Sequence, residues 1–140
     1  GARAAGRIMA AALARRPELS GFDALTAVPI HPRRERERGY NQAEIIAREI
    51  AAATGLPLLD VLERRRSGTP AWRLDRIARR RELIESFTIR LDAATPIEGR
   101  RILVIDDVAA TGTTLEACAK ALRAAGAADA AGYAFARSVT

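Results

Sequence analysis

The segment from Arg101 to Leu115 constrains the fold of this 140-residue chain more than any other. It opens with Arg101-Ile102-Leu103-Val104-Ile105, and an unbroken apolar run of this kind is typical of a strand buried on both faces. Asp106 and Asp107 come next, and small residues follow from Ala109 to Thr114. The sequence therefore predicts a buried strand that ends in two carboxylates, and then a compact loop.

Helical and strand patterns alternate along the rest of the chain. Helices are expected at residues 3–16 and 114–125 and after Asn41, which stands three residues before Glu44, the spacing of a capping box. Their apolar faces would be Ala43, Ile46, Ala47 and Ile50 in the middle helix, and Leu115, Cys118, Ala119 and Leu122 in the last. Strands are expected at 24–30, 56–62, 86–91 and 132–136, with a basic loop from Arg33 to Gly39. This alternation predicts an α/β domain with a mostly parallel sheet flanked by helices.

Length and composition narrow the class of protein. The chain is long enough for one domain, residues 1–140, with 49% apolar and 29% charged residues. No apolar run approaches the roughly 20 residues that cross a bilayer, and the start does not resemble a secretory signal. Cys118 is the only cysteine, so it forms no internal disulfide and no zinc cluster is expected. We expect a soluble cytoplasmic protein that does not insert into membranes.

The small-residue loop has the properties of a phosphate site. Gly112 can adopt backbone angles closed to other residues, so neighbouring N–H groups can converge on one oxyanion. The following helix adds partial positive charge at its N-terminus. The loop has no lysine, which a Walker A loop requires. We expect a phosphate monoester to bind at Ala110, Thr111, Gly112, Thr113 and Thr114.

Asp106 and Asp107 would repel a phosphate that stood alone, but they suit a sugar next to it. Carboxylates accept hydrogen bonds from vicinal ribose hydroxyls, and they hold Mg²⁺ directly or through its water ligands. A ribose diol at the two aspartates and a 5-phosphate at the loop form a consistent geometry.

This segment resembles the phosphoribosyl pyrophosphate signature of type I phosphoribosyltransferases, in which an apolar strand, two acids, a small loop and Thr-Gly-x-Thr-Leu follow one another. Two further motifs, Val28-Pro29-Ile30-His31-Pro32-Arg33 and Arg38-Gly39-Tyr40-Asn41-Gln42, are similar to the ComF branch, named for competence for DNA uptake. The resemblance implies that fold and binding of phosphoribosyl pyrophosphate or a related sugar phosphate with Mg²⁺. It also implies that Arg33 and Arg38 contact the pyrophosphate, while Arg34 and Arg36 are better read as solvated. The four-cysteine zinc module common in ComF proteins does not occur in this sequence.

Residues 63–86 match the mobile, basic hood of the family in position, and Arg80 falls near a family arginine. A short helix is expected after Asp75. The family usually has glutamine where Trp72 stands, and its asparagine near residue 83 is absent. Trp72 is expected either to stack on a base or to cover the core. His31 is more often structural than catalytic in such a Pro-flanked loop, and no catalytic acid or base is assigned.

The distribution of arginine leaves three functions open. Twelve of the 22 arginines fall in residues 33–38 and 64–81, and such clustering favours an anionic partner. The first reading is an enzyme that transfers the phosphoribosyl group to an unknown acceptor. The second is a non-catalytic accessory protein of competence that binds single-stranded DNA or competence proteins, although 4% aromatics is low for stacking on bases. The third is a sensor of the sugar phosphate.

Overall fold

The computed structural model describes residues 1–15, 20–65, 69–92, 94–109 and 112–137. Its core is a three-stranded parallel sheet in the order β1 (Ala24–Ala27), β4 (Arg101–Ala109) and β5 (Asp129–Arg137). In this register Leu25 lies opposite Leu103, which in turn lies opposite Ala131. The segment before β2 joins the outer edge of β1 through a parallel bridge between Leu25 and Leu58. The predicted α/β fold with a parallel sheet is confirmed.

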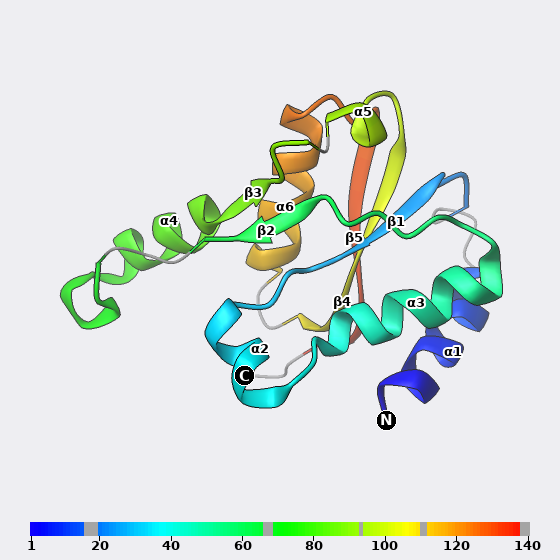
Figure 1. Ribbon diagram of the computed structural model, residues 1–140, viewed down its shortest axis with the longest axis horizontal. Helices are drawn as coiled ribbons and strands as arrows, with labels where there is room; N and C mark the ends of the chain where they lie inside the picture. The colour runs from blue at the N-terminus through cyan, green and yellow to red at the C-terminus, as the bar shows by residue number, and fades with distance from the viewer. Residues whose placement is uncertain (16–19, 66–68, 93, 110–111, 138–140) are drawn as a thin grey trace.

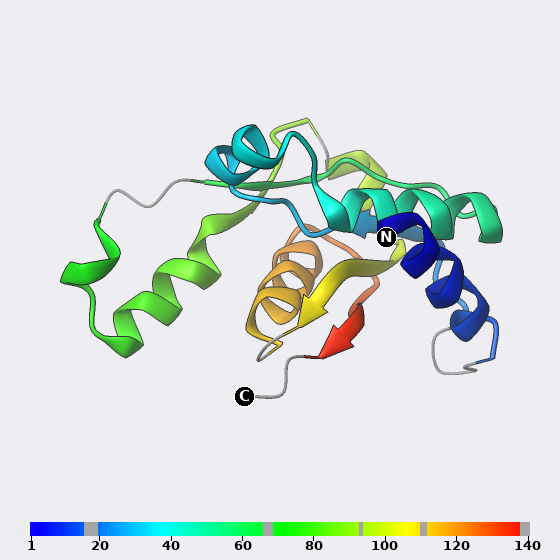
Figure 2. The ribbon, with the colours of Figure 1, turned by 90° about the horizontal axis from the view of Figure 1, so that it is seen from below.

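Helices cover both faces of this sheet. α1 (Ala2–Leu13) and α3 (Gln42–Thr54) pack on one face, and α6 (Thr113–Ala124) packs on the other (Figures 1 and 2). The predicted apolar face of α3 is completely buried. On α6, Cys118, Ala119 and Leu122 are buried, and Leu115 packs partly buried against the same cluster. The period of 3.6 residues predicted both contact faces correctly.

The basic segment expected to be a loop is instead a short helix, α2 (Pro32–Arg38). His31 Nδ1 accepts a hydrogen bond from the backbone N–H of Arg33 at 3.1 Å, and Pro32 occupies the first helical position, where its missing N–H costs nothing. Gly39 ends the helix with a positive φ of 80°. Capping at both ends thus forms a helix that has no buried residue.

Strand boundaries also differ from the sequence expectation. Within the expected strand 56–62, Leu58 makes an isolated bridge to Leu25, and Leu62 is the first residue of β2 (Leu62–Arg64). β3 (Phe87–Ile89) is shorter than expected, β5 is longer, and a helical turn, α5 (Ala94–Ile97), precedes β4.

Residues 62–89 form a stem and a projection. β2 and β3 pair antiparallel, with Leu62 opposite Ile89 and Arg64 opposite Phe87. Beyond this stem lie a short 3-10 helix, Ala71–Arg73, and α4 (Arg76–Ser86), which begins after Asp75 as expected and is capped by the Asp75 side chain. Figures 1 and 2 show α4 extending away from the sheet. Trp72 is 77% exposed, so the expectation that it covers the core is wrong.

Within the part of the chain that the structure describes, every helix is too short or too polar to pass through a membrane.

Candidate functional site

The carboxyl ends of β1 and β4 meet at one edge of the sheet, where ligands of open α/β folds bind. The backbone N–H of Val28 donates to the carbonyl of Ile105 at 2.9 Å. This bond places the Pro29–His31 segment directly beside the residue that precedes the acidic pair. The sequence motifs around residues 28–41 and 102–115 therefore lie together in space.

Asp106 and Asp107 lie within β4, not after its end as expected from the sequence, because pairing with β5 continues past them to Ala109. Asp106 accepts a hydrogen bond from the backbone N–H of Asp107 at 2.8 Å, and Asp107 accepts one from Val108 at 2.9 Å. Burial, and then a side-chain hydrogen bond from Asp107, raise the pKa of Asp106 to about 7. The two half-buried carboxyl groups are therefore close enough to interact directly.

This acidic pair fits a magnesium ion. Two adjacent carboxylates repel each other, and a divalent cation or the hydroxyls of a diol would relieve that repulsion. Mg²⁺ typically takes one or two protein carboxylates and completes its shell with water and substrate phosphates. Among the described residues no group of three or more His, Cys, Asp and Glu side chains could form a larger metal centre.

The start of α6 lies three residues beyond β4. Gly112 is its N-cap with φ +80°, and Thr113 and Thr114 follow, both half-buried. Ala110 and Thr111, also expected in the phosphate site, lie outside the described residues. A helix N-terminus presents backbone N–H groups and partial positive charge to an anion.

The position of α6 against the sheet depends on Gly132 in β5. A Cβ atom at this position would stand 2.7 Å from Cβ of Leu115, closer than side-chain atoms normally approach. Leu115 belongs to the first turn of α6, directly after Thr113 and Thr114. The absence of a side chain at residue 132 thus sets the position of the helix end that would face the phosphate.

The α2 segment carries the two arginines expected to contact pyrophosphate. Arg33 is exposed and bonds to Glu37 at 3.3 Å, and Arg38 is exposed in the last turn. Asn41 caps α3 by accepting from the N–H of Ala43 at 3.1 Å, as expected, and its amide donates to the carbonyl of Val28 at 3.1 Å. Asn41 therefore joins α3 to the end of β1. His31 has the structural role of a helix cap.

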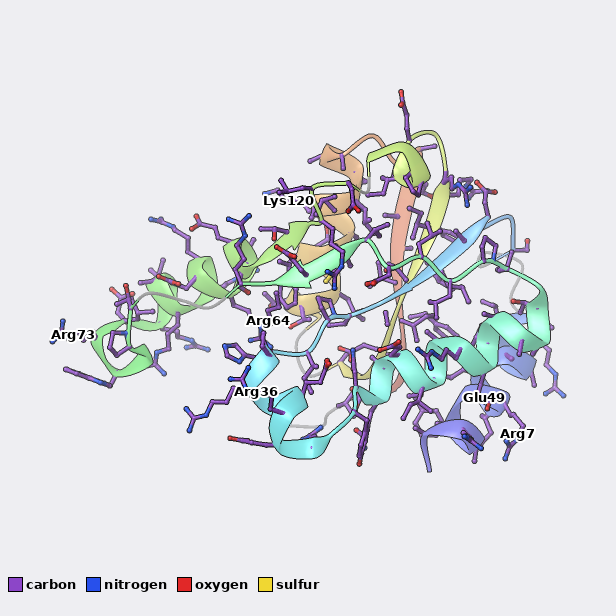
Figure 3. All side chains as sticks on the ribbon, in the orientation of Figure 1. Arg7, Arg36, Glu49, Arg64, Arg73 and Lys120 are labelled. Atoms are coloured by element: carbon purple, nitrogen blue, oxygen red, sulfur yellow. The ribbon has the colours of Figure 1, made fainter. Side chains whose placement is uncertain are left out.

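A cleft of about 1000 Å³ opens between α2, α3 and the β2–β3 stem. Sequence reasoning missed two of its arginines, Arg36 on α2 and Arg64 on β2 (Figure 3). Arg64 is half-buried, and its guanidinium lies 5.3 Å from the centre of the Phe87 ring. Burial, and then the nearby charge of Arg34, lower the pKa of Arg64. The one available signal was the alternation that places Leu62 and Arg64 on the same face of a strand.

Together, the parallel sheet with helices on both faces, the acidic pair in the last part of β4 and the helix that follows define a phosphoribosyltransferase-type class of α/β domain. The phosphoribosyl transferase domain model matches residues 36–137, and the chain therefore belongs to that family.

Its sequence relatives include proteins of DNA uptake and use. Competence protein F of Haemophilus influenzae is 31% identical over 105 residues, which are 74% of this chain and 45% of that protein. Competence protein ComFC of Streptococcus pneumoniae is 36% identical over 104 residues, 73% of this chain and 42% of the relative. DNA utilization protein YhgH of Escherichia coli O157:H7 is 30% identical over 76% of this chain and 45% of its own length. The chain thus spans less than half the length of these relatives.

Solved structures share the fold. Glutamine phosphoribosylpyrophosphate amidotransferase from B. subtilis superposes with a TM-score of 0.62 at 22% identity, over 95% of this chain and 26% of that one. A purine phosphoribosyltransferase from Pyrococcus horikoshii gives a TM-score of 0.54 at 16% identity, over 95% and 82% of the two chains. At these identities the likeness shows the fold alone.

Proposed function

We propose that this domain binds phosphoribosyl pyrophosphate at the corner between β4 and α6. The ribose diol would rest on Asp106 and Asp107, and the 5-phosphate would bind at the helix start, at Ala110, Thr111, Gly112, Thr113 and Thr114. The observation that carries this proposal is the short separation along the chain between two half-buried carboxylates in the last four residues of β4, which ends at Ala109, and the N-terminus of a twelve-residue helix that begins at Thr113. The carboxylates suit hydroxyl donors, while the helix end suits an anion.

The pyrophosphate would lie between this corner and α2, where Arg33 and Arg38 are proposed to contact it. Mg²⁺ held by Asp106 and Asp107, directly or through water, would offset negative charge on the leaving pyrophosphate. Family membership supports this arrangement.

The reaction that such a site supports is displacement at ribose C1. The bond from C1 to the pyrophosphate oxygen breaks, a bond from an incoming nucleophile forms, and the nucleophile releases its proton. Positive charge develops on C1 and the ring oxygen, so the protein contributes mainly by positioning the sugar and stabilising charge. Steady release of pyrophosphate in a screen of amine and base acceptors would distinguish a transferase from a sensor that only binds the ligand.

The binding site itself is tested by thermal unfolding with and without phosphoribosyl pyrophosphate and Mg²⁺. The ligand should raise the melting temperature of the wild type, because it binds only the folded state. The double variant Asp106→Asn, Asp107→Asn should abolish this rise. The variant Asp92→Asn, Glu98→Gln, which removes the same charge at exposed positions, should retain it. An unchanged rise in the Asp106/Asp107 variant rejects the site.

A second function, binding of single-stranded DNA, is supported by the hood. Arg76, Arg79, Arg80 and Arg81 are exposed on α4, and the Arg73 guanidinium lies 4.9 Å from the centre of the exposed Trp72 ring. Exposed arginines neutralise backbone phosphates, and an exposed indole can stack on a base. The names of the relatives, competence and DNA utilization proteins, agree with this candidate.

Fluorescence anisotropy with a labelled oligonucleotide at several salt concentrations tests this candidate. Affinity should fall steeply with salt, and the double variant Arg79→Gln, Arg80→Gln should lower the slope of log K against log salt by about 0.7 for each lost phosphate contact. Trp72→Ala should weaken binding with little change of slope. No binding at about 50 mM salt, where phosphate contacts are strongest, would eliminate the candidate.

A further inference from the structure

The two edges of the parallel sheet are covered to different extents. At the β1 edge, the N–H of Leu25 donates to the carbonyl of Pro57 at 2.9 Å, and the N–H of Leu59 donates to the carbonyl of Leu25 at 2.7 Å. At the opposite edge, in the part of the chain that the structure describes, no strand pairs with β5 on its outer side (Figure 2). A strand edge presents a row of N–H and C=O groups with which another chain can pair.

The ladder with β4 shows which backbone groups of β5 point outward. The N–H of Asp129 donates to the carbonyl of Arg100, which directly precedes β4, at 3.5 Å. The N–H and C=O groups of one strand residue point to the same side, and successive residues alternate. Odd-numbered residues of β5 therefore bond to β4, and the residues whose backbone groups point outward are Ala130, Gly132, Ala134 and Ala136.

The outward groups have partners at the beginning of the strand. The N–H of Ala130 donates to the Asp129 carboxylate at 2.8 Å, and the Arg123 guanidinium donates to the carbonyl of Ala130 at 2.8 Å. The outward groups of Gly132 and Ala134 form no hydrogen bond with another described residue, and Gly132 is exposed. The open part of this edge therefore begins after Ala130.

The sequence of the open part contains none of the residues that block strand pairing. Natural proteins protect sheet edges with charged side chains, proline or β-bulges. Residues 130–136 read Ala-Ala-Gly-Tyr-Ala-Phe-Ala, without a charge or a proline. Phe135 is 46% exposed although it belongs to a strand of the core sheet. These properties suit an edge that pairs with another strand.

We propose that β5 pairs antiparallel with β5 of a second copy of this chain, about a twofold axis at Ala134. In this register Ala134 lies opposite Ala134 of the second copy, and Gly132 lies opposite Ala136. Residues whose groups point toward each other in this way exchange two hydrogen bonds per pair. Tyr133 then lies opposite Phe135 of the second copy, and such aromatic cross-strand pairs stabilise antiparallel strands. Ala130, whose outward groups already have partners, stays outside the paired stretch.

A second copy fits this edge for two reasons. The register that uses the open outward groups is self-complementary, so the same strand can form both sides of the junction. Twofold pairing also consumes the open β5 edge of both copies, so the assembly closes as a dimer and does not grow into a fibre. The paired stretch is short, and we therefore expect a weak dimer that depends on protein concentration.

Sedimentation velocity of the full chain, from about 5 to about 500 µM, tests the dimer in the range where weak interfaces assemble. The weight-average mass should rise from 15.1 kDa toward twice that value. Ala134→Pro should weaken association at least about tenfold, because it removes the N–H that would bond across the axis. An outward N–H makes no bond to β4, so proline is compatible with the monomer at this position. A wild type that remains monomeric at the highest concentration overturns the proposal.

Leu91→Thr is the matched control. It removes an apolar side chain that is 99% exposed in the turn after β3, and this variant should dimerise as the wild type does. If Ala134→Pro lowers the melting temperature markedly, Phe135→Lys replaces it, because a charge on an edge strand opposes pairing and leaves the backbone unchanged. Dimerisation that persists in both variants shows that the copies meet elsewhere and overturns the proposal.

Disulfide crosslinking tests the register. Ala134→Cys should give a crosslinked dimer on mild oxidation, because a hydrogen-bonded antiparallel pair places its two Cα atoms about 5.5 Å apart, within disulfide range. Asp129→Cys, at the start of the same strand, should remain monomeric under these conditions. The native Cys118 is buried in the core and should not compete. Equal crosslinking of the two variants, or none at residue 134, overturns the proposed twofold axis.

Discussion

Asp106, which belongs to the proposed binding site, also affects the stability of the fold. Its carboxyl group is half-buried at the end of the sheet, and Asp107 interacts with it from the next position. Burial therefore raises the pKa of Asp106 to about 7, and the hydrogen bond from Asp107 adds to the rise. Close to neutral pH the ligand-free site carries less than the two negative charges that its sequence suggests. A cation or two hydroxyl donors would favour the charged form.

The raised pKa predicts a stability that falls as pH rises. The folded protein holds a proton on Asp106 up to about pH 7, whereas the unfolded chain loses it near pH 3.8. The free energy of unfolding should therefore decrease between about pH 4 and pH 7 in magnesium-free buffer and then level off. Asp106→Asn should lack this decrease and should be more stable than the wild type at pH 8, by ~1–2 kcal/mol after allowance for partial exposure.

Urea unfolding at pH 5, 6, 7 and 8 measures this effect. Asp92→Asn, at an exposed position, is the control and should follow the wild-type curve. Parallel curves for the wild type and Asp106→Asn over this range would show that Asp106 titrates at its ordinary pKa.

At the scale of elements, the position of α6 against β5 determines the shape of the corner that is proposed to bind phosphate. Leu115 occupies the space that a side chain at residue 132 would need. We expect Gly132→Ala to overpack this contact and lower stability by about 1–3 kcal/mol. It should also weaken ribose 5-phosphate binding, because the first turn of α6 must shift.

A double-mutant cycle tests the cause of that effect. Leu115→Ala should by itself lose apolar contact with the core. In the Gly132→Ala background it should recover part of the lost stability, because it removes Cδ1 and Cγ, which stand 3.0 and 3.1 Å from the added Cβ, although its own Cβ at 2.7 Å remains. A coupling free energy near zero, measured by urea unfolding, would show that the two residues act independently.

The elements that the sequence predicted well are those whose burial follows a regular period. The α3 face Ala43, Ile46, Ala47 and Ile50 is an example, because tertiary packing and local periodicity agree there. The helix α2 was missed because it has no buried face, although Pro32 and Gly39 mark both its ends. The end of β4 was misplaced because apolar character stops at Ile105, whereas pairing with β5 continues to Ala109. The cleft with Arg36 and Arg64 depends on contact between distant segments, which no local pattern encodes.

For the molecule as a whole, the structure divides into a packed core and a basic projection. The sheet strands β1 and β4 contain fully buried residues, as do α3 and α6, while α4 contains none. Its partly buried Leu83 and Ile84 touch the core near the stem, and Arg76–Arg81 lie farther along the helix. Stability should therefore be distributed unevenly along the chain.

Hydrogen exchange measured by mass spectrometry should show this division. Peptides from the first half of α4 should exchange at least about tenfold faster than peptides from α3 and α6, because helix amides without buried contacts open locally. Phosphoribosyl pyrophosphate with Mg²⁺ should slow exchange at the start of α6. Equal protection of α4 and α6 in the ligand-free protein would contradict the division.

The β2–β3 stem affects which parts of such a domain can change in sequence and length during evolution. Because Arg64 and Phe87 stand opposite each other in the β2–β3 ladder, the two ends of the segment between them lie side by side at the stem. Insertions, deletions or replacements in the part of that segment before Leu83 and Ile84, which pack against the core, need not disturb the packing of the strands. Descendants of one ancestral domain can therefore retain the same core and the site proposed at its edge while they acquire different partners.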